Sequence, residues 1–354
     1  MTATTAFAQP MSDHYLTSIT RNAGLAERLP QELELPRDRW RTGDLVFTEV
    51  LESGPVPYWV ETPSGRSVEV LPGDVVIGAL GRRAATLEAV GDWRAVEDDG
   101  VMQTLTSAGL LGKCTSASLP PPLMADVRYR AHAARDGAQL NMGDFAPDGP
   151  QQSLEAPVVL IVGTSMDSGK TVAAKAIVRV LKRMGLRVVG AKLTGVARLR
   201  DVLAVSDAGA DEVFDFVDVG LPSTVVAPER YEEALRGLLS LIAGARPDVV
   251  VAEAGASPLE PYNGEVAMRM LRERVACTVL CASDPYAIVG VMSAFGIEPT
   301  LLSGRATSTE AAIDLIHKLV GIEALNLLDH RTHPRLAEIL GEQLGRASVA
   351  GARG

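Results

Sequence analysis

The segment from Gly163 to Thr171 constrains this chain more than any other part of its sequence. It reads Gly-Thr-Ser-Met-Asp-Ser-Gly-Lys-Thr and lies between an apolar run at 157–162, which predicts a buried strand, and residues 172–184, which predict a helix. A glycine-bounded loop in this setting directs backbone N–H groups and the helix N-terminus toward a bound phosphate. The usual pattern has four residues between its glycines. This loop has five, so it is a variant of that pattern.

The positions of this loop have expected roles in binding a nucleotide. Lys170 is expected to reach the β- and γ-phosphates, and the Thr171 hydroxyl is expected to bind Mg²⁺. The other positions are expected to surround the phosphates: Gly163, Thr164, Ser165, Asp167, Ser168 and Gly169.

The region 156–346 alternates apolar runs with helical patterns. The predicted strands are rich in Val, Ile and Leu without clean alternation, as expected when both faces of a sheet are covered. This pattern predicts an α/β fold: a P-loop NTPase domain with a mostly parallel sheet flanked by helices, which binds ligands at the carboxyl ends of its strands. The expected strands are 157–162, 187–192, 248–253, 276–281, 299–302 and 323–328, and the expected helices are 169–184, 229–243, 264–274, 286–295, 307–320 and 334–345.

The N-terminal part of the chain has a different pattern. Short β-type runs separated by Gly and Pro turns predict a smaller all-β domain over 36–120, a barrel or a sandwich. All three tryptophans fall in this region and are expected to fill its core. Residues 1–35 are expected to form a leader, 121–155 a linker rich in Pro, Gly, Asp and Gln, and 347–354 a tail of small residues.

Three charged residues follow predicted strands or lie between them in the C-terminal region. Lys192 ends the second predicted strand, Asp207 lies in Val-Ser-Asp-Ala, and Glu253 follows Val-Val-Val-Ala. A lone Lys or Asp near a strand end is more often a solvated surface group, whereas an unpaired carboxylate is costly to bury. Together with the phosphate loop, these residues predict a magnesium site made by Thr171, Asp207 and Glu253. Lys192 is expected to be a second cation facing the γ-phosphate, so Lys170 and Lys192 are the candidate catalytic residues.

Composition excludes several classes of function. The formal charge of −10 argues against a nucleic-acid groove, and no apolar stretch approaches the ~20 residues that cross a bilayer. The three cysteines suggest a reducing compartment. We therefore expect a cytoplasmic protein with neither nucleic acid nor membrane as a partner.

The C-terminal region resembles the dethiobiotin synthetase family and its relatives, which include the ATPase domains of cobyric acid synthase and cobyrinate amidase. The resemblance lies in the loop, in Lys192, in Ser-Asp-Ala around Asp207 and in Glu-Ala-Gly-Ala from Glu253. It implies that Asp207 and Glu253 bind Mg²⁺ and that Asn326 contacts adenine. The loop has Ser165 where that family has Asp, and Leu rather than Pro follows Lys192. The two-domain layout looks more like a branch that includes proteins assigned as D-amino-acid N-acetyltransferases.

Three functions follow from these observations. The first is an enzyme that uses ATP and Mg²⁺ to activate a carboxylate or carbamate of a small-molecule acid by phosphoryl transfer, as a ligase does. The second is an N-acyltransferase that binds acetyl-CoA and acts on an amino acid. The third is a switch ATPase of the partitioning class, although the loop has no lysine at its early positions. Relatives of this fold are often dimers, so a homodimer is expected.

Overall fold

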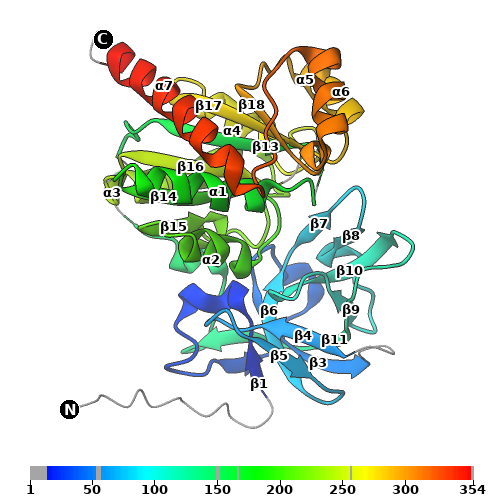
Figure 1. The fold of residues 1–354 in the computed structure, drawn as a ribbon. Helices are drawn as coiled ribbons and strands as arrows, with labels where there is room; N and C mark the ends of the chain where they lie inside the picture. The colour runs from blue at the N-terminus through cyan, green and yellow to red at the C-terminus, as the bar shows by residue number, and fades with distance from the viewer. Residues whose placement is uncertain (1–13, 53–56, 149–151, 166, 256, 352–354) are drawn as a thin grey trace, which may run out of the picture.

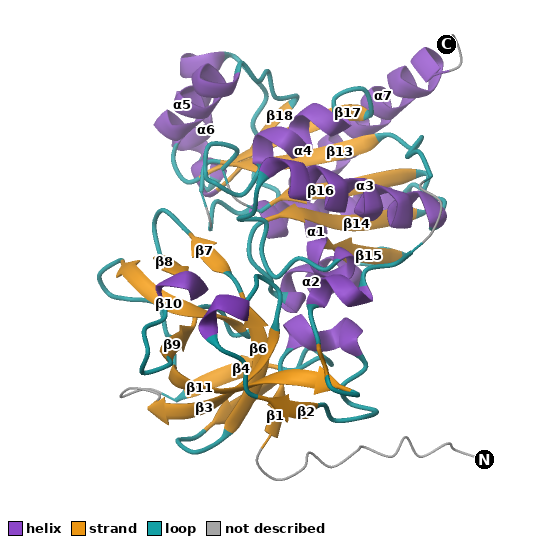
Figure 2. Cartoon of the chain, turned by 180° about the vertical axis from the view of Figure 1, so that it is seen from behind, coloured by secondary structure: helices purple, strands orange, loops and turns teal. Residues whose placement is uncertain are grey.

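The chain folds into a β domain and an α/β domain that pack against each other. The computed structural model describes residues 14–52, 57–148, 152–165, 167–255 and 257–351. In Figure 1 the β domain lies below the α/β domain, and Figure 2 shows both from behind. Among the described residues, no helix combines the length and the apolar character that crossing a membrane requires.

The β domain is built on a closed ring of strands. β3, β6, β10, β9 and β11 pair in that order, and β11 pairs with β3 to close the ring. β1, β2, β7, β8 and β12 extend the sheet, while β4 and β5 form a separate hairpin. The bounds are β1 His14–Leu16, β2 Gln31–Leu33, β3 Leu45–Glu52, β4 Tyr58–Glu61, β5 Ser67–Val70, β6 Val75–Leu80, β7 Arg82–Ala84, β8 Ala89–Asp92, β9 Val101–Thr104, β10 Leu110–Ala117, β11 Asp126–Arg135 and β12 Ala138–Gln139.

Three of the expected domain boundaries are wrong where the structure describes them. β11 lies inside the expected linker at 121–155, yet it pairs with β2, β3, β9 and β12. β1, β2 and the 3₁₀ helix η1 (Ser18–Ala23) lie inside the expected leader at 1–35 and pack on this domain; residues 1–13 lie outside the described residues. The last helix runs to Gly351, into the expected tail. Both expectations in the N-terminal half failed because a strand's partners are distant in sequence and composition does not reveal them.

The α/β domain contains a six-stranded parallel sheet in the order β15-β14-β16-β13-β17-β18. This arrangement confirms the predicted α/β class. Two elements between residues 199 and 215 were not predicted, α2 and β15, and 323–328 forms only a bridge from Ala324 to Leu302 instead of a strand. The strands are β13 Val158–Gly163, β14 Val188–Thr194, β15 Glu212–Asp215, β16 Val249–Ala254, β17 Val275–Ala282 and β18 Leu301–Gly304.

Helices cover both faces of this sheet. α1, α2 and α7 pack on one face, at the front in Figure 1, and α3 and α4 pack on the other, at the front in Figure 2. Alternate residues of β13 point to opposite sides, so Val159 and Ile161 contact the first set and Leu160 and Val162 the second. The helices are α1 Lys170–Arg183, α2 Leu199–Asp207, α3 Pro228–Gly244, α4 Gly264–Leu271, α5 Pro285–Phe295, α6 Glu310–Val320 and α7 His333–Gly351.

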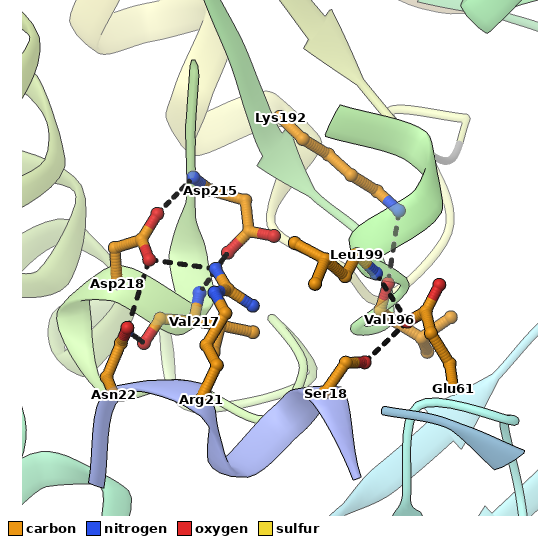
Figure 3. Close-up of polar contacts among 10 residues, drawn as sticks. All are labelled: Ser18, Arg21, Asn22, Glu61, Lys192, Val196, Leu199, Asp215, Val217 and Asp218. Atoms are coloured by element: carbon orange, nitrogen blue, oxygen red, sulfur yellow. Dashed lines mark hydrogen bonds and ion pairs between the residues drawn. The ribbon is translucent and has the colours of Figure 1, made fainter. Parts of the chain in front are cut away.

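Apolar packing and buried ion pairs join the two domains. One hydrophobic cluster runs from Ile19 and Phe47 of the β domain to Phe216 of the α/β domain. Beside it, Arg21 of η1 forms ion pairs of 2.6 Å with Asp215 and 2.8 Å with Asp218 (Figure 3). The β domain is therefore held beside the carboxyl ends of β14 and β15.

The tryptophans do not all lie in the core of the β domain. Trp40 is buried and its indole N–H donates to the carbonyl of Leu35, 3.1 Å away. Trp59, on β4, is 49% exposed. The expectation that the tryptophans fill this core is therefore wrong for Trp59, because its neighbours Tyr58 and Val60 point into the core and successive residues of a strand point to opposite sides.

Candidate nucleotide site

The loop from Gly163 to Thr171 connects β13, at the middle of the sheet, to the first turn of α1. Gly169 has φ +97°, a conformation that strains residues with a side chain, and a Cβ there would lie 3.0 Å from the Cα of Gly304. Gly163 leaves room for the phosphate-loop lysine, since its Cβ would lie 2.8 Å from the Cδ of Lys170. Steric crowding therefore favours glycine at both positions, in addition to the phosphate contacts expected of the loop.

The Lys170 side chain lies folded into this loop. It is buried, and its Nζ donates to the Ser165 carbonyl at 2.7 Å and to the Ser168 hydroxyl at 3.4 Å. The Thr164 hydroxyl accepts the backbone N–H of Ser283 at 3.1 Å, which ties the start of the loop to the end of β17. Of the expected phosphate-binding residues, Asp167, Gly169, Lys170 and Thr171 line the cavity described below, whereas Gly163, Thr164, Ser165 and Ser168 do not.

Glu253 lies next to the first turn of α1. It stands in register with Ile161 of β13 and Lys192 of β14, and its Oε2 accepts the Thr171 hydroxyl at 3.2 Å. Burial raises the pKa of the Glu253 carboxyl, while the charges of Lys170 and Lys192 act in the opposite direction. The structure therefore brings together two cations, a hydroxyl and a carboxylate from three elements.

These donors fit a magnesium ion that is shared with phosphate. Mg²⁺ binds oxygen, keeps several waters and takes one or two carboxylates together with phosphate oxygens. The Thr171 hydroxyl and the Glu253 carboxylate are oxygen donors in contact with each other. Among the described residues no group of three or more His, Cys, Asp or Glu side chains could hold a metal by itself, so the remaining ligands would come from phosphate and water.

Lys192 lies at the carboxyl end of β14 with two partners. Its Nζ is 2.5 Å from Asp201 Oδ2 and donates to the Val196 carbonyl at 3.1 Å; Figure 3 shows the second contact. Burial opposes ionisation of Asp201, but the charge of Lys192 and its hydrogen bond outweigh that effect and lower the pKa of this carboxyl. Lys192 is consequently oriented by Asp201 toward the cavity.

Asp207 and Asn326 do not lie at this site. Asp207 is the exposed last residue of α2, and it does not line the cavity. The expected magnesium contact of Asp207 is therefore wrong, because Asp207 ends the helix whose first turn carries Asp201, about 9 Å farther along the axis at 1.5 Å per residue. Asn326 also lies outside the cavity, and its Oδ1 accepts the backbone N–H of Leu328 at 3.1 Å, so it forms a local turn.

The sequence analysis missed the residues of α2 that lie at the site. Leu199, Val202 and Val205 recur at a helical spacing and are buried, which is the signal that could have placed this helix and its first turn at the site. The N-terminal end of this helix contributes three residues to the cavity lining, Arg198, Arg200 and Asp201. Glu88 was not predicted either, because no pattern in the sequence around it indicates that the β domain contributes to this cavity.

The β domain closes one side of the cavity. The volume is about 280 Å³, and Glu88, in the turn between β7 and β8, is part of the lining. Two hydrogen bonds hold this turn against the α/β domain: the Tyr262 hydroxyl accepts the N–H of Ala84 at 2.8 Å, and Glu260 accepts that of Thr86 at 3.1 Å. Residues from both domains therefore form the cavity.

Glu61 of the β domain also binds the N-terminus of α2. Its carboxylate is buried and accepts the backbone N–H groups of Leu199 and Arg200, each at 2.8 Å, and the hydroxyl of Ser18. Figure 3 shows the contacts with Leu199 and Ser18. The first N–H groups of a helix have no partner within the helix, and negative charge there is favourable. Glu61 thereby holds the helix that carries Asp201.

Comparisons with known proteins give only distant similarity. No protein-family profile and no curated protein matches the chain. Among solved structures, it is similar to the signal recognition particle receptor FtsY of Elizabethkingia anophelis (15% identity, 51% of this chain and 59% of that one, TM-score 0.35). It is also similar to chloroplast FtsY of Physcomitrella patens (15% identity, 50% and 59%, TM-score 0.33). A DUF1611 family protein of Anabaena variabilis matches with 14% identity over 60% of this chain and 66% of that one, at a TM-score of 0.38.

The matched region spans about three-fifths of each FtsY chain. Identities and TM-scores of this size assign no function.

Proposed function

We propose that this protein is an enzyme that uses ATP and Mg²⁺ to activate a carboxylate or carbamate of a small acid by phosphoryl transfer. One observation carries the proposal: Lys170, Thr171, Lys192 and Glu253 converge on a single cavity at the carboxyl ends of β13, β14 and β16. Phosphoryl transfer requires positioning and charge neutralisation more than covalent help from the protein. Two lysines beside a phosphate loop supply that neutralisation.

Each side chain has a separate part in this proposal. Lys170 neutralises the β- and γ-phosphates, and Lys192, oriented by Asp201, faces the oxygen that attacks. Thr171 and Glu253 would hold Mg²⁺, which when bound would offset the negative charge of the phosphates. The β domain limits the access of water, since its Glu88 turn lies over the cavity.

The reaction balances as two displacements. A carboxylate oxygen of the acid attacks the γ-phosphorus, the bond to the bridging oxygen of ADP breaks, and an acyl phosphate forms. An amine then attacks the acyl carbon, inorganic phosphate leaves, and the amine proton passes to solvent. The products are an amide, ADP and phosphate.

Release of phosphate from ATP, measured with and without a set of small organic acids, tests this function. We expect turnover to rise when an acid is added and to fall at least about 100-fold in Lys170→Ala, as when a transition-state donor is removed. Lys175→Ala, on the same helix but outside the cavity lining, is the matched control and should keep full turnover.

Two results would count against the proposal. Full turnover in Lys170→Ala would show that the phosphate loop takes no part in the reaction. Acetyl transfer from acetyl-CoA to an amino acid, without any need for ATP, would instead favour the acyltransferase. Binding of labelled ATP measured on the same samples separates a loss of binding from a loss of chemistry.

A further inference from the structure

One arginine from each domain belongs to the wall of the cavity: Arg198 lines it, and Arg83 pairs with Glu88, which also lines it. Arg198 directly precedes α2 and lines the cavity. Arg83 comes from β7, and its side chain is only 2% exposed. Burial lowers the pKa of Arg83, and the positive charge of Arg198 lowers it further. The positive charge of Arg198 therefore acts on Arg83 across the boundary between the two domains.

The hydrogen bonds of these guanidinium groups are incomplete. The Nη1 of Arg83 donates to the Leu105 carbonyl at 2.7 Å and its Nη2 forms an ion pair with Glu88, but its Nε is buried with no partner among the described residues. The Nε of Arg198 is also buried with no partner in the described part of the chain. A buried donor without a partner loses its hydrogen bonds to water and gains none in return, so this is an unusual arrangement for a structural contact.

The nearby acidic groups are already engaged. Asp201 pairs with Lys192, Glu253 accepts from Thr171, and Glu88 pairs with Arg83. No ion pair between described residues includes Arg198.

Two tyrosines near Arg83 add no negative charge to this part of the protein. Burial raises the pKa of both Tyr58 and Tyr262 to about 12, so both hydroxyls are neutral at pH 7. Arg198 therefore lines the cavity without an ion-pair partner among the described residues.

We propose that Arg198, with Arg83 behind it, forms an oxyanion subsite that binds a carboxylate of the acid substrate. This inference rests on the proposed function, because it names the residues that hold the acid. A guanidinium presents its donors in a planar fork that matches a carboxylate in a two-point contact. The subsite and the phosphate loop open on one cavity, so the acid is held on the β-domain side while the phosphates bind at the loop.

Calorimetric titration of the full-length protein with acetate, succinate, benzoate and inorganic phosphate tests the subsite, and ATP is titrated separately. We expect at least one carboxylate to bind the wild type more tightly than phosphate does. Arg198→Met should raise the Kd of that carboxylate at least about tenfold, or ~1.4 kcal/mol, and Arg198→Lys should recover only part of the affinity. ATP affinity should stay within about threefold in both variants, because the phosphate loop is intact.

Arg183→Met is the matched control, since Arg183 is an exposed residue of α1 outside the cavity. Its carboxylate and ATP affinities should equal those of the wild type. Thermal unfolding of each variant separates a lost subsite from a lost fold.

The outcomes separate this inference from the proposed function. Unchanged carboxylate affinity in a folded Arg198→Met protein, absence of carboxylate binding to the wild type, or a preference for phosphate at Arg198 would each overturn the subsite. A wild type that binds a carboxylate through Arg198 but does not bind ATP would refute the proposed function and leave the subsite in place.

Discussion

The ion pair between Arg21 and Asp215 gives the sharpest prediction about how the two domains hold together. The Asp215 side chain is completely buried, Arg21 is 13% exposed, and the two are 2.6 Å apart. Asp215 Oδ1 also accepts the N–H of Val217 at 2.7 Å, while its Oδ2 has no partner in the described residues. Arg21→Met therefore leaves a buried carboxylate with a single backbone donor.

Removing one partner of a buried ion pair typically costs about 3–5 kcal/mol. For a domain of about 200 residues each kcal/mol lowers the Tm by roughly 2–4 °C, so Arg21→Met should lower the Tm by roughly 6–20 °C. Urea unfolding followed by circular dichroism and by tryptophan fluorescence measures the loss, and two probes show whether the domains still unfold together. Asp215→Asn added to Arg21→Met should recover part of the loss, because the amide carries no charge.

Arg28→Met is the matched control. Arg28 pairs with Asp136 at 3.0 Å in the same domain, but the two side chains are 63% and 72% exposed. An exposed pair contributes about 0–1 kcal/mol, so this variant should unfold almost as the wild type does. Equal destabilisation by the two substitutions would refute the assignment of the Arg21 pair as a buried link between domains.

The effect of Arg21→Met should depend on pH. Burial raises the pKa of the Asp215 carboxyl, and loss of the Arg21 charge should raise it further. An acid whose pKa is higher in the folded state than in the unfolded state stabilises the fold fully at a pH below its unfolded pKa. That contribution is lost as the pH rises through the folded pKa. The deficit of Arg21→Met should therefore be full at pH 8 and should shrink as the pH falls toward the ordinary value of 3.8. A deficit that grows on acidification would contradict this account.

Three further predictions concern the site and the core. Glu61→Ala should destabilise the protein by about 2–4 kcal/mol in urea, since it removes a buried acceptor of three hydrogen bonds; a loss below 0.5 kcal/mol would show that α2 needs no such partner. Asp201→Asn should lower ATP turnover at least about tenfold through Lys192, whereas Asp207→Asn should leave the rate of phosphate release unchanged, and the reverse order would restore Asp207 to the site. At pH 8 a thiol reagent should label only Cys114 quickly in the native protein, because burial raises the pKa of the two β17 cysteines to about 11 and about 12; rapid labelling of three thiols would show that β17 is accessible.

Local sequence was sufficient for the features that depend on neighbours in the chain. The glycine-bounded loop, the strand before it and the helix after it follow from a few consecutive residues, because helical hydrogen bonds and loop conformation are local. Lys192 and Glu253 could be placed at the same edge because parallel strands end together, and they stand in register. The α/β class and the core of the candidate site were readable for this reason.

Only the tertiary structure decided which distant residues complete the site. β11, which lies inside the expected linker, pairs with β3. Glu61 binds a helix that begins 138 residues later, and Glu88 of the β domain lines the same cavity as Arg198. Sheet pairing and domain contact join residues whose separation along the chain carries no periodic signal. The sequence alone therefore predicted the loop and the strand edge of the candidate site, while the partners of α2, the place of Arg198 at the cavity and the wall formed by the β domain required the folded chain.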